Sequence, residues 1–257
     1  MEAHQVKFRA GADPEVFLQD SSGKHISAIG YINADKWNPM QIPDMPKGFT
    51  LQEDNVSLEY GIPPAASAEE LVSHINSVMK KSLEYLPGLS FSKLSCTIFT
   101  EDQMQHPLAH VFGCEPDVNA WTEDFNPKPA PPHPFMRSAG GHIHVETKAE
   151  PKSVIKAMDL FLGVPSILMD TGEDRKQMYG KAGAHRVKPY GVEYRTLSNF
   201  WIFKEEYIHW VWRNTALALD NLGLAEIYGK RIQHTINNND KAEAEALVGE
   251  LMLEVLV

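Results

Sequence analysis

The sequence predicts an α+β fold built on an antiparallel sheet. Strand-like segments fill the front half of the chain, the middle is mixed, and helical periodicity dominates the end. Helices that cover one face of such a sheet leave its other face free to form an active site.

Six segments have the composition and alternation of strands, and several of them contain charged residues between apolar neighbours. These segments are 6–18, 25–32, 56–60, 90–99, 142–146 and 191–196.

Helical periodicity is clear in four segments. The first, 67–86, opens with Ser67 and Glu70 in capping-box spacing and has an apolar stripe. The second starts at Pro151, a residue suited to a first helical turn. The third is 205–222 and the fourth is 240–253, where Asp240 and Glu243 form a second capping box.

Composition limits the classes of function. The 257 residues are 43% hydrophobic, which is enough for a buried core, and the formal net charge is −10. A chain this acidic repels phosphate at long range, so we expect neither nucleic acid nor a membrane as a partner. Oligomeric state is left open.

Localisation is predicted to be cytoplasmic. The two cysteines, Cys96 and Cys114, have no zinc-site spacing, suggest no disulfide scaffold and are interpreted as core or structural residues. The first residues lack the apolar core of a signal peptide, and no apolar run approaches the length of a membrane span.

Three glutamates lie in apolar strands: Glu15, Glu59 and Glu193. A carboxylate in such a setting is costly unless it is paired or binds a cation. Three strands that each offer one glutamate would form an oxygen-rich pocket for Mg²⁺ or Mn²⁺. The alternative is that each glutamate faces solvent on a half-buried strand.

Segment 140–146, Gly-Gly-His-Ile-His-Val-Glu, has two histidines at strand spacing. Alternate residues of a strand share a face, so His142, His144 and Glu146 should project together and could bind a metal or position a phosphate. The alternative is a solvent-facing strand with Ile143 and Val145 in the core.

A third cluster is basic and lies among glycines between residues 170 and 195, which suggests a cationic loop for polyphosphate. A merely solvated loop is the alternative. Arg195 differs from the rest, because it shares a strand face with Glu193. The cluster contains Arg175, Lys176, Lys181, Arg186, Lys188 and Arg195.

Other motifs are absent from the sequence. It has no P-loop, no Gly-x-Gly-x-x-Gly after a strand and no Gly-x-Ser-x-Gly nucleophile elbow. Nucleotide binding of the P-loop kind is therefore excluded.

Taken in order, the motifs resemble the superfamily of glutamine synthetase and glutamate–cysteine ligase, and within it the phage-type COOH–NH2 ligases, or predicted amidoligases. The resemblance covers roughly residues 8 to 215. It rests on segments 11–18 (Gly-Ala-Asp-Pro-Glu-Val-Phe-Leu), 58–64 (Leu-Glu-Tyr-Gly-Ile-Pro-Pro), 137–144 (Arg-Ser-Ala-Gly-Gly-His-Ile-His), 170–175, 179–184 and 191–201.

The resemblance implies a glutamine-synthetase-like curved antiparallel sheet with helices on its convex face. It implies one catalytic domain over residues 1–257, with C-terminal helices from about residue 205. An ATP-dependent, ADP-forming ligase with two or three Mg²⁺ ions would follow, acting in the host bacterial cytoplasm if the gene belongs to a phage.

The resemblance also implies site residues. Glu15, Glu59, His142 and Glu193 correspond to positions that hold catalytic Mg²⁺, and Asp54 is a further ligand candidate. Arg195 looks like the arginine that contacts the transferred phosphate. The remaining candidates for phosphate or substrate contacts are Arg137, His144, Arg175, Lys181 and Arg186.

The predicted reaction forms an amide or peptide-type bond through an acyl phosphate. The substrates are an unidentified small-molecule or peptide carboxylate and amine. Two rivals remain: a metal-dependent amide hydrolase, and a non-catalytic protein that keeps the fold and binds ATP or metal. The proline-rich segment 126–134 is neither helix nor central strand and is a candidate mobile cover over the site.

Overall fold

The computed structural model describes residues 8–111 and 117–256, and its fold is organised around one large sheet. Within this part of the chain ten strands form one sheet, and every pairing is antiparallel. The main strand order is β3-β4-β5-β1-β10-β12-β11-β8, and β2 and β6 both pair with β1. The strands are β1 (Arg9–Gln19), β2 (His25–Ile26), β3 (Met40–Gln41), β4 (Thr50–Asp54), β5 (Ser57–Gly61), β6 (Ser90–Ser92), β8 (Val118–Asn119), β10 (Gly141–Glu146), β11 (Ala184–Lys188) and β12 (Gly191–Tyr194). A separate two-stranded sheet joins β7 (Cys96–Ile98) to β9 (Met136–Ser138).

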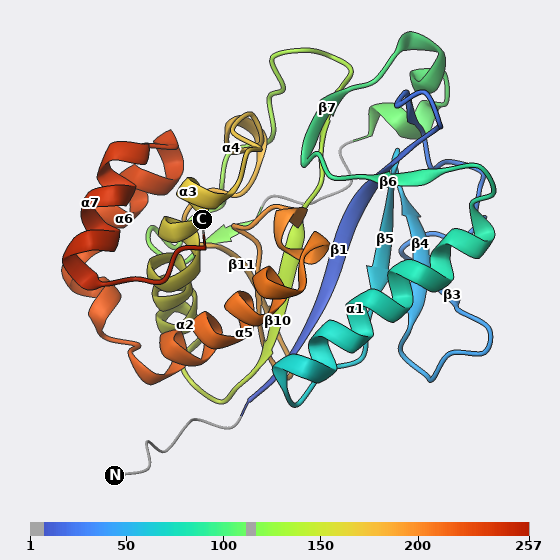
Figure 1. Ribbon diagram of the computed structural model, residues 1–257. Helices are drawn as coiled ribbons and strands as arrows, with labels where there is room; N and C mark the ends of the chain where they lie inside the picture. Colours follow the sequence, from blue (N-terminus) through green and yellow to red (C-terminus); the bar gives the residue numbers. More distant parts are fainter. Residues whose placement is uncertain (1–7, 112–116, 257) are drawn as a thin grey trace.

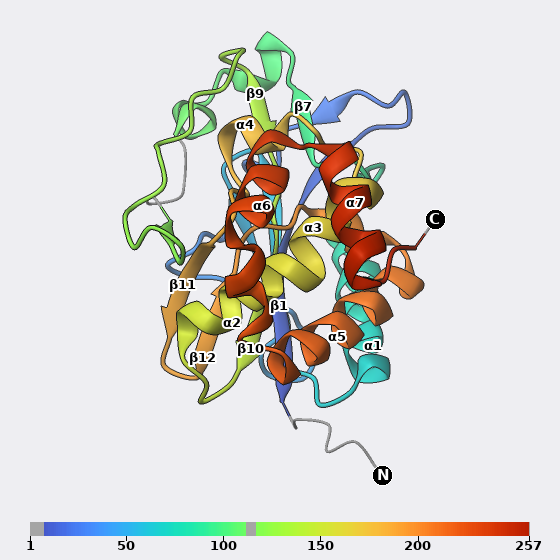
Figure 2. The same cartoon turned by 90° about the vertical axis from the view of Figure 1, so that its left-hand side faces the viewer.

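Helices form the second layer. In Figure 1, α1 and α5 cross in front of the strands, and α2, α3, α6 and α7 gather beside them. Figure 2 shows this helical group from its own side, with the strands behind it. The α-helices are α1 (Ala68–Ser82), α2 (Pro151–Met158), α3 (Val164–Met169), α4 (Arg175–Met178), α5 (Glu205–Asp220), α6 (Leu224–Asn238) and α7 (Lys241–Leu251). Four short 3₁₀ turns span Leu83–Tyr85, Glu101–Met104, Pro107–His110 and Asn199–Phe203, and a π-helical turn, Asp159–Gly163, joins α2 to α3.

Side-chain alternation gives the main sheet two unlike faces. On one face, Val16, Ile143, Val145 and Val192 are fully buried in the core that the helices complete. The other face carries the polar residues of the same strands, because neighbouring residues of a strand point to opposite sides. The prediction of an α+β fold with a large antiparallel sheet and helices is therefore confirmed.

Local signals explain where the main helices begin. The Ser67 side chain accepts a hydrogen bond from the Glu70 backbone N–H (3.1 Å), and Asp240 does the same for Glu243 (3.1 Å). Both capping predictions are thus confirmed. Pro151 occupies the first turn of α2, as predicted.

Three details of the secondary-structure prediction were wrong. The predicted strand 90–99 is two strands, because β6 pairs with β1 whereas β7 turns away to pair with β9. The cationic segment 170–195 contains α4 and β11, so Arg186 and Lys188 lie on a strand rather than in a loop. Helix α6 was not predicted. Its buried face includes Gly229, where a Cβ would lie 2.8 Å from the Trp121 ring, and such small residues give a weak apolar stripe.

The remaining expectations concern single segments. Residues 126–134 form neither helix nor strand, as predicted. Cys96 is a free, half-buried thiol, and Cys114 lies outside the described residues. Within the described ranges, no helix has both the length and the apolar character needed to cross a bilayer.

Candidate functional site

The strand register gathers acidic and basic side chains on the polar face of the sheet. Glu15 on β1 lies opposite Glu59 on β5, and Asp13 lies opposite His142 on β10. His144 in turn lies opposite Glu193 on β12. Residues that are far apart in sequence therefore meet in a strip that crosses four neighbouring strands.

The first cluster, called here the carboxylate group, consists of Glu15, Asp54 and Glu59. One carboxylate oxygen from each residue lies within 4.8 Å of the others. The Glu15 side chain is held in place because its Oε2 accepts a hydrogen bond from the Gly140 backbone N–H (2.7 Å).

Like charges dominate the carboxylate group. Burial, and then the charges of neighbouring carboxylates, raise the pKa of Glu59 well above its ordinary value. Burial and the charge of Glu15 raise the pKa of Asp54 to about 6. A bound divalent cation would offset this repulsion, and three carboxylates are a donor set that suits Mg²⁺ or Mn²⁺.

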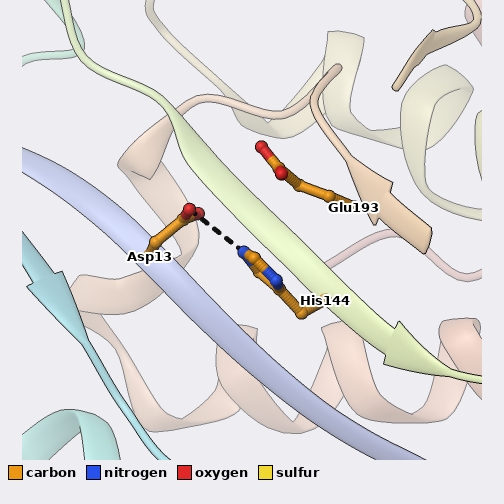
Figure 3. A group of neighbouring side chains, drawn as sticks. All are labelled: Asp13, His144 and Glu193. Atoms are coloured by element: carbon orange, nitrogen blue, oxygen red, sulfur yellow. Dashed lines mark ion pairs between the residues drawn. The ribbon is translucent and has the colours of Figure 1, made fainter. Parts of the chain in front are cut away.

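The second cluster, called here the histidine group, consists of Asp13, His144 and Glu193 from β1, β10 and β12 (Figure 3). His144 Nε2 lies 3.0 Å from Asp13 Oδ2. Burial acts to raise the pKa of Asp13, yet the charges and hydrogen bonds of His144 and His142 hold that pKa well below its ordinary value. The pKa of His144 is raised, because the attraction of Asp13 outweighs the effect of burial.

Glu193 is surrounded by cations although it is fully buried. Lys188 Nζ lies 2.6 Å from Glu193 Oε2, and Arg195 forms a short ion pair with Oε1. Burial alone would raise the pKa of Glu193, but the charges of Arg195 and the two histidines lower it to about 2. The histidine group is therefore neutralised by side chains of the chain itself.

His142 and Arg195 lie beside the histidine group and contact each other. His142 Nδ1 lies 3.2 Å from Asp13 Oδ1, 3.9 Å from Glu193 Oε1 and 3.2 Å from an Arg195 nitrogen. Arg195 Nε also donates to Asp117 Oδ1 (2.7 Å). His142 thus contacts residues of the histidine group and stands beside the arginine that shares this site.

A cleft opens over the carboxylate group. Glu15, Asp54 and His142 line it together with Arg137, Arg175 and Arg195. Acidic and basic side chains that the sequence analysis placed in separate clusters therefore face one cavity.

The other basic candidates have different settings. The guanidinium of Arg137 donates hydrogen bonds to backbone carbonyls, including one from Nε to Ala109 O (3.0 Å). Arg175 donates to Thr196 O (3.1 Å). Lys181 donates to Asn237 O (3.3 Å), away from the strip, and Arg186 lies 3.7 Å from Glu193 Oε1. Only part of the basic cluster therefore faces the cleft.

A second cavity adjoins the histidine group. The residues that line it include Asp13, His144, Tyr190, Arg9 and Glu146. The hydroxyl of Tyr190 makes a short hydrogen bond to His144 Nδ1. The strip of candidate metal ligands therefore adjoins two separate cavities.

Sequence reasoning missed several members of the site. Asp13 could have been found, because it lies two residues before Glu15 and shares its strand face. Asp117 and Tyr190 had no comparable signal, and Lys188 was placed in the basic cluster but not among the site residues. They reach the site through β11, its turn into β12 and the chain before β8.

Comparison with known proteins assigns part of the chain to a family. Residues 130–242 match the family described as Phage phiEco32-like COOH.NH2 ligase-type 2. This segment contains His142, His144, Glu193 and Arg195, whereas the carboxylate group lies before it. No curated protein matches the chain.

Two solved structures are similar to the chain at low identity. One is a bifunctional glutathione synthetase from Pasteurella multocida, with 11% identity and a TM-score of 0.44, covering 96% of this chain and 49% of that one. The other is GmaS solved without ligand, with 12% identity and a TM-score of 0.46, covering 96% and 65%. The chain thus spans about half of the first protein and less than two thirds of the second.

Proposed function

We propose that this chain, whose residues 130–242 belong to the phage-type COOH–NH2 ligase family, is an ATP- and Mg²⁺-dependent carboxylate–amine ligase. The observation that supports the proposal most directly is the cleft in which Glu15, Asp54 and His142 meet Arg175 and Arg195. Such a mixture of ligands for hard cations and fixed positive charges suits a polyphosphate with its metal ions.

The substrate carboxylate must first be converted into an acyl phosphate, because an amine cannot displace an oxygen from a free carboxylate. In the proposed sequence, a carboxylate oxygen of the substrate attacks the γ-phosphorus of ATP, the bond to the β,γ-bridging oxygen breaks, and ADP leaves. The amine nitrogen then attacks the acyl carbon of the acyl phosphate, inorganic phosphate leaves, and the nitrogen loses a proton. Two anions must approach each other in the first step, so positive charge at the site is required.

The residues on the polar face supply the groups that such chemistry needs. The carboxylate group, His142 and Glu193 would hold Mg²⁺, which when bound neutralises phosphate charge and orients the γ-phosphate. Arg195 is anchored by Asp117 and Glu193, so its guanidinium is fixed before charge develops on the phosphoryl group.

The two cavities suggest how substrates are divided. We assign ATP to the cleft lined by Arg175 and Arg195, and the organic substrates to the cavity beside His144 and Tyr190. The segment 126–134 is the candidate cover that would exclude water from the acyl phosphate.

The test is nucleotide consumption by the purified protein. The protein is incubated with ATP, Mg²⁺ and pooled amino acids, polyamines and small peptides, and chromatography separates ADP from AMP. The proposal predicts ADP release that requires the pool and disappears in Glu15→Gln. Glu245→Gln, an exposed change on α7, is the matched control and should keep full activity.

Other outcomes would contradict specific parts of the proposal. AMP release would rule out the acyl phosphate in favour of adenylation. Amide hydrolysis without ATP would support the alternative function, a metal-dependent amide hydrolase. If the folded protein bound neither ATP nor Mn²⁺, the assignment of ATP and its metal ions to the cleft would be wrong.

A further inference from the structure

Asp159 is a buried carboxylate on the helix side of the sheet, and the proposed reaction does not use it. It lies in the π-helical turn between α2 and α3 and has no exposed surface. Its Oδ2 accepts hydrogen bonds from Trp121 Nε1 (2.7 Å) and the Gly183 backbone N–H (2.6 Å). Its Oδ1 lies 2.9 Å from the Tyr194 hydroxyl and 3.1 Å from the Thr196 hydroxyl.

Three of these four donors come from the backbone segments that present the site. Tyr194 and Thr196 flank Arg195, and Tyr194 also follows Glu193 directly. Gly183 precedes Ala184, whose carbonyl accepts the Arg195 backbone N–H (3.0 Å). Because side chains alternate along β12, fixing Tyr194 on the helix side also fixes the directions of its two neighbours on the polar side.

The same chain segment is held from a second direction. Lys176 Nζ donates to Thr196 O (2.9 Å) and Gly180 O (2.7 Å), and Arg175 donates to Thr196 O as well. Thr196 is therefore held by cations at its carbonyl and faces Asp159 with its hydroxyl. The segment after β12 has little freedom to shift while both sets of contacts exist.

The cost of burying this carboxylate indicates that its contacts matter. Burial raises the pKa of Asp159 to about 6 in spite of its four donors. The backbone around it is also closely fitted, since a Cβ on Gly163 would lie 2.8 Å from the Tyr194 hydroxyl oxygen. π-helical turns of this kind are frequent near functional sites.

We propose that Asp159 is a positioning residue that holds Glu193 in place for metal binding and Arg195 in place for contact with the transferred phosphoryl group, without reaching the cleft itself. Partners of this kind orient the groups that contact a metal, and their loss commonly costs 10- to 100-fold in metal affinity or activity. The inference rests on the proposed function for its kinetic readout, whereas its metal-binding readout needs no turnover.

The test compares variants that remove donors or the acceptor from the same carboxylate. Asp159→Asn replaces an acceptor oxygen by an N–H donor at equal size. Tyr194→Phe removes the donor beside Glu193, and Trp121→Phe is the matched control because it removes a donor that lies outside the 183–196 segment. Mn²⁺ affinity is measured by calorimetry, at the site that loses binding in Glu193→Gln, together with kcat, the KM for ATP and the melting temperature.

We expect Asp159→Asn and Tyr194→Phe to weaken Mn²⁺ binding and lower kcat, each by about 10- to 100-fold, with the KM for ATP changed by about twofold or less. Trp121→Phe should lower the melting temperature but change Mn²⁺ affinity and kcat by less than about threefold.

Two results would overturn the inference. The first is that Tyr194→Phe and Trp121→Phe lower the melting temperature alike and leave Mn²⁺ affinity unchanged, which would make Asp159 a purely structural residue. The second is normal affinity in a folded Asp159→Asn protein. If that variant does not fold, Tyr194→Phe decides alone. A wild-type protein without turnover would count against the ligase proposal only, because Mn²⁺ affinity still distinguishes the variants.

Discussion

The carboxylate group and the histidine group lie on the same face of one sheet, yet their electrostatic settings are opposite. In the carboxylate group, Glu15, Asp54 and Glu59 face one another, and the pKa values of Asp54 and Glu59 are raised. In the histidine group, His144 pairs with Asp13, the cations Lys188 and Arg195 contact Glu193, and the two carboxyl pKa values are lowered.

The difference shows what each group requires to be stable. Mutual repulsion makes the carboxylate group dependent on a cation from solution, so it should be the group most altered by metal removal. The histidine group contains its own counter-charges and should keep its arrangement without metal. Four measurements can break or sharpen this contrast.

The largest expected effect is a difference in sign between two Glu→Gln changes in metal-free protein. Glu193→Gln removes the carboxylate that Lys188 and Arg195 contact in a buried site, which should cost about 3–5 kcal/mol and lower the melting temperature by roughly 10 °C. Glu59→Gln relieves repulsion and should raise the free energy of unfolding by about 1 kcal/mol. Thermal melts in chelator test both, and two changes of the same sign would contradict the contrast.

Metal addition should have a somewhat smaller effect, which depends mainly on an intact carboxylate group. At a metal concentration about 100 times the Kd, binding to the native state stabilises it by about 2.7 kcal/mol. We expect Mg²⁺ or Mn²⁺ to raise the melting temperature of the wild type, and to raise it much less in Glu59→Gln or Asp54→Asn. An undiminished rise in both variants would show that the carboxylate group binds no metal.

The pH dependence of stability should also separate the groups. The folded pKa of Asp54, about 6, is above its ordinary 3.8, so the folded state binds more protons and stability falls as pH rises from about 4 to 6. Glu193 has a folded pKa of about 2, below its ordinary 4.5, so its contribution is present above about pH 4.5 and is lost as pH falls toward 2.

Denaturant unfolding of metal-free protein across pH 3 to 7 measures these slopes. Each contribution should be on the order of 1–3 kcal/mol. Asp54→Asn should reduce the decline between pH 4 and 6, to which Asp159 and Glu59 also contribute because burial raises their pKa values too. Glu193→Gln should reduce the loss at lower pH, which Asp13 shares. A slope between pH 4 and 6 that is unchanged in Asp54→Asn would assign it to the other groups.

The smallest effect is expected from Arg186, the outermost of the cations around Glu193. Its side chain is 37% exposed and its nearest nitrogen lies 3.7 Å from Glu193 Oε1. Arg186→Gln should therefore lower stability by less than about 1 kcal/mol, because water screens an exposed pair. A loss of stability as large as that of Glu193→Gln would mean that the cations Lys188 and Arg195 do not neutralise Glu193 without Arg186.

Much of the site was predictable because strand alternation is a local property. The spacing of His142 and His144 placed them on one face of a strand. The apolar neighbours of Glu15, Glu59 and Glu193 indicated carboxylates that need a counter-charge or a bound cation. Asp13 followed from the same rule but was overlooked. Helix α6 was missed because its buried face contains small or polar residues such as Ala225, Gly229 and Thr235, and strand β11 was missed because charged residues interrupt it. Each is stabilised mainly by what it packs against or pairs with.

The sequence by itself determined the class of fold, the two N-caps, the shared face of each strand's polar residues and the candidate metal ligands. These depend on spacings of two to four residues, which local geometry translates directly into direction. Only the tertiary structure decided that the acidic residues divide into two groups, that Asp117 and Lys188 join them, and that Asp159 supports β12 from the helix side. Those relations depend on strand order and register, and they join residues that no local pattern connects, such as Asp117 and Arg195, 78 positions apart.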